Sequence, residues 1–282
     1  MTKHLHTRLL VFLFVAFALP WSVHGQAAQQ PSDAEVYGQY RRWVSGRAST
    51  ETHTDAIAQQ VDVMAAYRKA LTDQGISPAE SDRRVRVITE SGRRLENDMW
   101  NRMLTAPNPI FNVEPNAFMV RVTKGVRPGT ALDYGMGQGR NAIYLAQQGW
   151  TVTGFDPADQ AVAAAQEQAR KLGVKLTTLV VGDDQFEFGK AQWDLIVMTY
   201  VGFRASVPRL FESLKPGGIV VVEAYHRDSL KNASIGPAVV FDTNELLKLF
   251  ERFRVLHYED AEDKADFGKA GNRVVRLVAQ KP

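Results

Sequence analysis

One stretch of the sequence joins a short apolar strand, a tight glycine turn and the first residues of a helix: Ala131-Leu132-Asp133-Tyr134-Gly135-Met136-Gly137-Gln138-Gly139-Arg140-Asn141. Glycines at alternate positions permit backbone dihedral angles that a side chain would forbid, and they let backbone N–H groups come close to a ligand. A helix that opens at Arg140 adds unpaired N–H donors and a partial positive charge. The stretch is therefore typical of a turn that holds a nucleoside cofactor.

The spacing of the glycines distinguishes two kinds of nucleoside site. The fingerprint of nicotinamide dinucleotide folds is Gly-x-Gly-x-x-Gly. Counted from Gly135 and Gly137, its third glycine would stand at position 140, where this chain has Arg140. The chain instead has Asp-x-Gly-x-Gly-x-Gly, from Asp133 to Gly139. This spacing disfavours a nicotinamide oxidoreductase, which we keep as the second enzyme alternative.

The observed spacing resembles motif I of class I S-adenosylmethionine-dependent methyltransferases. The longer run Gly139-Arg140-Asn141-Ala142-x-x-Leu145-Ala146-x-x-Gly149 is similar to their tellurite-resistance and thiol methyltransferase branch, and the resemblance extends from about Phe111 to the C-terminus. It implies S-adenosylmethionine as the cofactor and Asp133 near its methionine amino group. The cofactor-binding residues that it implies in this stretch are Asp133, Gly135, Gly137, Gly139 and Asn141. Met136 stands where the family often has Cys, at a position that contributes mainly backbone.

From residue 130 onward, strand-like and helix-like segments alternate, which predicts a parallel sheet with helices on both faces. The resemblance implies a Rossmann-like, mostly parallel sheet of seven strands. In open sheets of this kind, ligands bind beyond the carboxyl ends of the strands, so the residues after each strand are site candidates. The strand candidates are Ala131–Asp133, Val152–Phe155, Leu176–Val181, Leu195–Thr199, Ile219–Glu223, Val255–His257 and Arg273–Val278.

Carboxylates follow two of these strands. Asp156 ends the second strand, and a carboxylate there can accept hydrogen bonds from both ribose hydroxyls. The alternative is a helix cap, because Asp156 precedes Pro157 and a helical stretch. The resemblance assigns Asp183, after the third strand, to the adenine amino group. Its neighbour Asp184 shares this assignment, and a simple turn carboxylate is the alternative for both.

Tyr200, Tyr225 and His226 follow the fourth and fifth strands and can face a methyl acceptor. His226 is the best candidate for a general base, because histidine gains and loses a proton most readily near neutral pH; ordinary loop packing is its alternative. Methyl transfer from a sulfonium is an in-line displacement with an activated donor, so alignment and exclusion of water do most of the work. A soft nucleophile such as a thiolate needs no strong base. We therefore expect a small-molecule acceptor and favour a soft one.

The first 25 residues differ from the rest. Lys3 and Arg8 precede the apolar run 9–19, Pro20 ends this run, and small residues precede a cleavage site after Gly25. This order is typical of a signal peptide, and the run is shorter than the ~20 residues that a spanning helix needs. We expect export to the periplasm or the medium, with no stable membrane span once the signal is cleaved; an uncleaved anchor is the alternative.

Export conflicts with a cofactor that is made and kept in the cytoplasm. It therefore favours an alternative from another class, an exported nucleoside-binding or scaffold module that has lost turnover. The net charge of +3 falls to 3 − 2 = +1 without Lys3 and Arg8, which does not suggest a nucleic-acid partner. The absence of cysteine from the sequence excludes disulfides and a thiolate metal site, and no histidine spacing suggests a metal.

Between a polar linker at 26–32 and a methyltransferase domain at 111–282, residues 33–110 read as a helical segment that can cap the substrate site. An apolar stripe from Ile57 through Val61 to Leu71 ends before Gly75. Ser77-Pro78-Ala79-Glu80 is a capping box with proline at the first helical position. The helix that it opens carries a polar face on which arginines lie among acidic residues. This pattern predicts solvated local ion pairs; the alternative is an anion-selecting lid. The arginines of this face are Arg83, Arg84, Arg86, Arg93 and Arg94.

Overall fold

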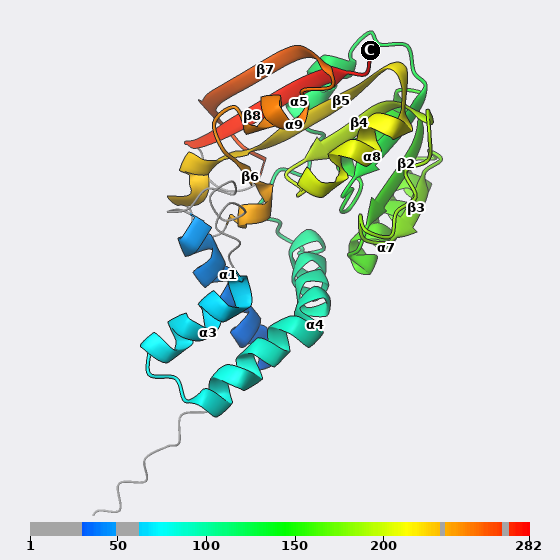
Figure 1. Cartoon of the computed structure of the whole chain (residues 1–282). Helices are drawn as coiled ribbons and strands as arrows, with labels where there is room; N and C mark the ends of the chain where they lie inside the picture. Colours follow the sequence, from blue (N-terminus) through cyan, green and yellow to red (C-terminus); the bar gives the residue numbers. More distant parts are fainter. Residues whose placement is uncertain (1–29, 49–61, 232–234, 267–270) are drawn as a thin grey trace, which may run out of the picture. The chain divides into compact units, whose positions relative to one another are not determined.

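A mixed β-sheet forms the core of the fold (Figure 1). The structure, a computed structural model, describes residues 30–48, 62–231, 235–266 and 271–282. Within these residues, strands lie in the order β3-β2-β1-β4-β5-β8-β7, and the short strand β6 pairs with β5. The neighbouring pairs β3–β2, β2–β1, β1–β4, β4–β5 and β5–β6 are parallel, whereas β8 runs antiparallel to β5 and β7. The bounds are β1 Thr130–Tyr134, β2 Thr151–Asp156, β3 Thr177–Val180, β4 Trp193–Thr199, β5 Leu214–His226, β6 Val240–Phe241, β7 Arg254–Asp263 and β8 Asn272–Gln280.

This sheet confirms the predicted Rossmann-like, mostly parallel architecture, and each of the seven predicted strands is present. The structure adds β6, which pairs Val240 and Phe241 with the end of β5. A strand of two residues is too short to show the alternating pattern by which strands are read from sequence.

Helices cover both faces of the sheet, as the alternation of segments predicts. On one face, Ala131 and Leu195 pack with residues of α5, α6 and α7. On the other, Leu132 and Ile196 pack with residues of α8 and α9. Strands that are buried on both faces need apolar residues at successive positions, which explains the continuous apolar runs in β1 and β4. These helices are α5 Ala117–Thr123, α6 Arg140–Gln147, α7 Asp159–Lys171, α8 Val207–Ser213 and α9 Glu245–Leu249.

The predicted N-terminal helical segment holds three described helices, α1 Asp33–Ala48, α3 Val63–Asp73 and α4 Pro78–Leu104. They pack around a small core that includes Tyr67, Leu71 and Val85. The Ser77 half of the predicted capping box is confirmed, because the hydroxyl of Ser77 accepts a hydrogen bond from the N–H of Glu80 at 3.3 Å. The carboxylate of Glu80 pairs with Arg83 and Arg84.

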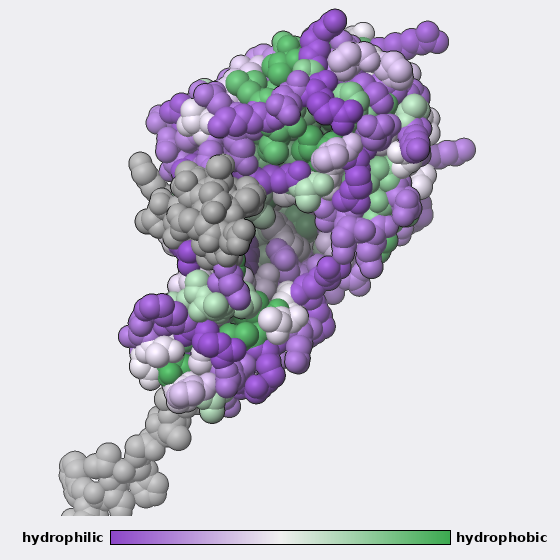
Figure 2. All heavy atoms as spheres, in the orientation of Figure 1, coloured by the Kyte–Doolittle hydropathy of each residue, from purple (hydrophilic) through white to green (hydrophobic). Residues whose placement is uncertain are grey.

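The predicted signal peptide at 1–25 lies outside the described residues, as do most of the linker and Ile57 and Val61 of the apolar stripe. In the part of the chain that the structure describes, no helix is long and apolar enough to cross a membrane. The visible face of the helices before the sheet is mostly hydrophilic (Figure 2).

Candidate functional site

The glycine turn connects β1 to α6 in the conformation that its sequence predicts. Gly135, Gly137 and Gly139 have φ angles of +67°, +53° and +79°. L-residues with a side chain rarely adopt this left-handed region, so glycine is required at all three positions. The chain also leaves little room there: a Cβ on Gly139 would lie 2.8 Å from the Cβ of Ala165, and one on Gly135 would lie 2.8 Å from a methyl of Val201.

Asp156 binds the glycine turn directly. Its Oδ2 accepts a hydrogen bond from the N–H of Gly137 at 2.9 Å, and its Oδ1 accepts one from the N–H of Ala158 at 2.8 Å. Burial raises the pKa of this carboxyl, and the two N–H donors oppose that rise. The contact with Ala158, the N-cap residue of α7, supports the helix-cap interpretation. The contact with Gly137 also brings Asp156 beside the predicted cofactor turn, and its role toward ribose stays a prediction.

Asp133 lies beneath the start of α6. It is buried, and its Oδ2 accepts a hydrogen bond from the N–H of Ala142 at 3.0 Å. Burial raises the pKa of Asp133 to about 7, while the charge of Arg140 and the N–H of Ala142 oppose the rise. The carboxyl therefore holds the helix that follows the glycine turn.

Asn141, the other predicted cofactor residue of α6, is buried and links two neighbouring elements. Its Oδ1 accepts a hydrogen bond from the N–H of Asn116, the N-cap of α5, at 2.9 Å. Its Nδ2 donates to the Oγ1 of Thr199 at the end of β4, at 3.0 Å. These contacts fix the first turn of α6 between β4 and α5.

The structure separates the two neighbouring carboxylates after β3. Asp183 accepts hydrogen bonds from the hydroxyls of Tyr134 at 2.9 Å and Ser206 at 3.0 Å, so it lies at the end of β1. Asp184 instead pairs with Arg93 of α4 at 3.0 Å. Of the two, Asp183 lies beside the strand that leads into the glycine turn, and this makes it the better candidate for the adenine amino group.

The three predicted catalytic residues form two groups: Tyr200 and Tyr225 lie ring against ring, and His226 makes separate contacts with the residues that follow β5 and β6. Tyr200 donates a hydrogen bond to Glu223 Oε1 at 2.7 Å, and its ring lies 4.9 Å from the ring of Tyr225. His226 is buried with both ring nitrogens engaged: Nδ1 accepts from the N–H of Asp228 at 3.1 Å, and Nε2 lies 2.9 Å from Thr243 Oγ1. These contacts fit the packing interpretation of His226, and its role as a base stays a prediction.

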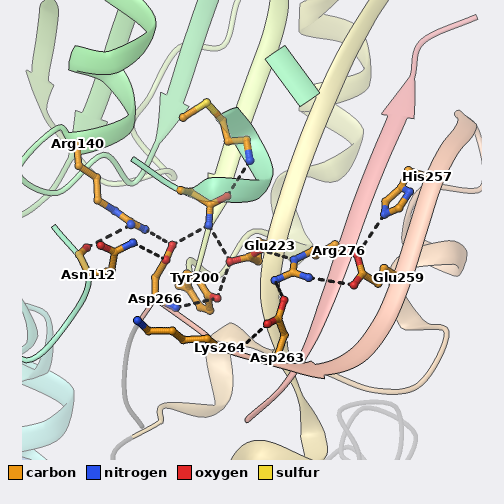
Figure 3. A network of polar contacts seen from close by, with 12 residues as sticks. Asn112, Arg140, Tyr200, Glu223, His257, Glu259, Asp263, Lys264, Asp266 and Arg276 are labelled. Carbon is orange, nitrogen blue, oxygen red and sulfur yellow. Dashed lines mark hydrogen bonds and ion pairs between the residues drawn. The ribbon is translucent and has the colours of Figure 1, made fainter. Parts of the chain in front are cut away.

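A buried polar network, which the sequence analysis missed, surrounds Tyr200 (Figure 3). Glu223 accepts hydrogen bonds from Asn116 Nδ2 at 2.7 Å and from Arg276 Nε at 2.5 Å, besides the one from Tyr200. Asn116 also donates to Asp266 Oδ2 at 2.7 Å. A signal was available in the sequence, because Glu223 and Arg276 are charged residues with apolar neighbours on both sides within their strands.

The same network reaches the glycine turn through Arg140. Arg140 pairs with Asp266 Oδ2 at 2.7 Å (Figure 3). It also donates to the carbonyl oxygen of Glu114 at 2.9 Å. The first residue of α6 is thereby tied to the segment that precedes α5 and to the segment that follows β7. Since buried charges are costly unless paired, this network fixes the loop after β4 and the segments before α5 and after β7 in one arrangement.

The end of α4 lies against both predicted cofactor segments. Asn101 donates to Asp159 Oδ1 at 2.7 Å and accepts from the N–H of Gln160 at 3.0 Å, so it caps the start of α7. Three residues later, Leu104 approaches the glycine turn: a Cβ on Gly137 would lie 3.3 Å from Leu104 Cδ1. The helical segment therefore contacts the turn that is expected to hold the cofactor.

Most of the arginines predicted on the polar face of α4 pair with carboxylates. Arg83 and Arg84 pair with Glu80, Arg94 pairs with Asp98, and Arg93 pairs with Asp184 as described above. The structure thus confirms the ion-paired face for these four side chains. Any selection of an anion has to come from other residues.

Comparison with known proteins gives the family. Residues 112–279 match the family model described as Tellurite resistance protein TehB. The chain belongs to the TehB family. The probable S-adenosyl-L-methionine-dependent methyltransferase TehB of Haemophilus influenzae is 27% identical over 165 residues, which cover 55% of this chain and 57% of that relative. The match thus spans little more than half the length of that TehB protein.

Two solved structures share the fold of this TehB family member. The N-methyltransferase NodS from Bradyrhizobium japonicum, in complex with S-adenosyl-L-homocysteine, is 15% identical, with a TM-score of 0.52 over 66% of this chain and 98% of that one. The [4+2]-cyclase SpnF is 16% identical, with a TM-score of 0.53 over 67% of this chain and 96% of that one. Because one of these names a methyltransferase and the other a cyclase, the shared fold alone does not decide the chemistry.

Proposed function

We propose that this protein transfers a methyl group from S-adenosylmethionine to a small-molecule acceptor. One observation carries the proposal: the left-handed glycine turn after β1 is hydrogen-bonded to the carboxylate at the end of β2, because Asp156 accepts a hydrogen bond from the N–H of Gly137. Membership in the TehB family, and the name of the Haemophilus influenzae relative, support it.

The residues at this edge of the sheet fit the cofactor. Each oxygen of Asp156 accepts one backbone N–H, and a carboxylate oxygen can accept a second donor, so two ribose hydroxyls can be accommodated. Asp183 is partly exposed and can accept a further hydrogen bond from the adenine amino group. When bound, S-adenosylmethionine supplies a methyl group on a positively charged sulfur, which becomes a neutral thioether when the methyl leaves. The glycine turn, α4 and the network around Glu223 align the acceptor and exclude water, effects that together can be worth ~7 to 11 kcal/mol.

We further propose that the acceptor is a soft nucleophile such as a thiol. The contacts of His226 with Asp228 and Thr243 engage both of its ring nitrogens. The hydroxyl of Tyr200 donates to Glu223. A thiolate fits this arrangement, because it needs no strong base in the transfer step.

Export is a separate proposal, supported by the basic, apolar and small-residue order of the first 25 residues. It also favours the second candidate, an exported nucleoside-binding module without turnover. Peptide mass mapping of the extracytoplasmic fraction tests export, for which we expect a mature chain that begins at or near Gln26. Intact Met1 on soluble cytoplasmic protein would contradict it.

Calorimetric titration of the purified protein with S-adenosylmethionine, S-adenosylhomocysteine and NADH tests the function. We expect both sulfur compounds to bind and NADH not to bind, followed by methyl transfer to at least one member of a panel of small thiols, phenols and amines. Binding of the sulfur compounds without turnover on the whole panel would favour the binding module. Binding of NADH alone would favour the oxidoreductase.

A further inference from the structure

A cavity of about 310 Å³ lies between α1, α4 and the residues just before the 237–239 turn. Three arginines line it, Arg41 and Arg42 from α1 and Arg102 from α4. Its apolar wall includes Leu95 and Met99. Among the described residues that line it, none is acidic. The cavity therefore combines a positively charged side with an apolar side.

The charges of these three arginines are not neutralised within the described residues, where none of them forms an ion pair. The guanidinium of Arg41 contacts the sulfur of Met99, and Arg42 and Arg102 are exposed. They differ in this from the paired arginines of the polar face of α4. An arginine without a carboxylate partner presents a planar fork of donors that matches a carboxylate.

One acidic side chain lies close to this group. Burial and the charge of Glu96 on α4 raise the pKa of Tyr37, which also lines the cavity, and the charge of Arg41 opposes this rise. A single carboxylate beside three guanidinium groups leaves an excess of positive charge. The field in the cavity is therefore positive.

One wall of the cavity leads toward the glycine turn. Leu104, which approaches Gly137, stands two residues after Arg102 and therefore lies on another face of α4 than the cavity lining. The wall that includes Ile235 and Gly236 continues along the chain to Ala238. Ala238 approaches Gly202, and the neighbouring Val201 approaches Gly135. This wall thus connects the cavity with the predicted cofactor turn.

We propose that this cavity binds the methyl acceptor by a carboxylate group, and that the acceptor is a small organic acid with an apolar body. This inference rests on the proposed function, since it names the acceptor of the same site. The three arginines hold the carboxylate, Leu95 and Met99 pack against the body, and the nucleophilic group faces the glycine turn. The volume is at the low end of the range for small-molecule sites, about 300 to 1,000 Å³.

Two probes of similar size test the proposal: 2-mercaptobenzoate, which has a carboxylate, and benzenethiol, which has none. Calorimetry gives their affinities, and methylation assays give kcat/KM. We expect wild type to favour 2-mercaptobenzoate, and Arg42→Gln and Arg102→Gln each to weaken it by about tenfold to a hundredfold, as expected for charge-assisted hydrogen bonds. Both arginines are exposed, so these variants should fold. Arg102→Lys should retain part of the preference, and benzenethiol should be unaffected throughout.

Arg94→Gln is the matched control, because Arg94 lies on the same helix but pairs with Asp98 outside the cavity lining. Equal affinity of wild type for the two probes, or equal effects of Arg94→Gln and Arg102→Gln, would overturn the proposal. Titration with S-adenosylmethionine separates it from the proposed function. A protein that binds 2-mercaptobenzoate through the arginines but binds no S-adenosylmethionine keeps the carboxylate site and loses the methyltransferase. A protein that methylates both probes equally well keeps the methyltransferase and loses the carboxylate site.

Discussion

Gly137 and Asp156, which are 19 positions apart, are joined by a hydrogen bond of 2.9 Å from the backbone N–H of the glycine to Oδ2 of the carboxylate. The turn after β1 and the end of β2 are therefore one unit. The same carboxylate also holds the N–H of Ala158 at the start of α7. A change at Asp156 consequently acts on the shape of the turn, on the helix and on any ligand that lies beside them.

Replacement of Asp156 by Ala should weaken binding of S-adenosylmethionine by roughly tenfold to a hundredfold, because hydrogen bonds to a charged group are worth ~1.5 to 3 kcal/mol. Asp156→Asn keeps the shape and an acceptor for one N–H, so it should lose affinity with a smaller loss of stability. Calorimetry and urea denaturation of both variants separate the effects. If both variants are less stable but bind S-adenosylmethionine with unchanged affinity, Asp156 acts only as a helix cap and not as a ribose ligand.

Replacement of Gly137 by Ala should abolish cofactor binding, because a side chain there meets Leu104 and stands at the surface of the turn. The matched control is Gly173→Ala. Gly173 also has a positive φ, +68°, but a Cβ there would meet nothing within 4 Å. Both variants should lose stability by about 1 kcal/mol from backbone strain. Equal affinities for S-adenosylmethionine in the two variants would contradict a cofactor site at Gly137.

The sequence predicts the turn, the strands and Asp156 because these depend on local rules. Glycine spacing, apolar runs and the residue after a strand can each be read from a few neighbouring positions. The network around Glu223 joins side chains such as Asn116 and Asp266 that are 150 positions apart, and no local pattern announces such a contact. The sequence does not predict the cavity arginines for a related reason, because tertiary packing decides which face of a helix lines a cavity.

The free energy of unfolding should fall as pH rises from about 4 to 7 because of Asp133. Its pKa is about 7 in the folded protein and near 3.9 when unfolded. Between these values the folded state holds more protons, so raising the pH favours unfolding, and above pH 7 the effect levels off. Asp133→Asn removes this component, so its stability relative to wild type should increase from pH 5 to pH 8. Urea denaturation at the two pH values measures it, and parallel pH dependences would refute it.

Replacement of Arg276 by Met should destabilise the protein by about 3 to 5 kcal/mol, because it leaves the buried carboxylate of Glu223 without its positively charged partner. The control is Arg170→Met. Arg170 pairs with Glu167 on the surface of α7, where solvent screens the pair, so no measurable change is expected. Chemical denaturation compares the two. Similar small effects would mean that the Glu223 network is solvated rather than buried.

Replacement of His226 by Ala distinguishes the two classes of acceptor. A soft anion requires alignment and exclusion of water, so the variant should methylate thiols at close to the wild-type rate. A hydroxyl or amine must lose a proton during transfer, and loss of the base would then cost ~10² to 10⁴ in rate. Since both ring nitrogens of His226 are engaged by Asp228 and Thr243, we expect thiols to be the substrates and the variant to stay active on them. His257→Ala is the control, because His257 is a half-exposed histidine of β7 near Glu259. If only phenols or amines are methylated, and activity collapses in His226→Ala but not in His257→Ala, the soft-acceptor proposal is wrong and His226 is the general base.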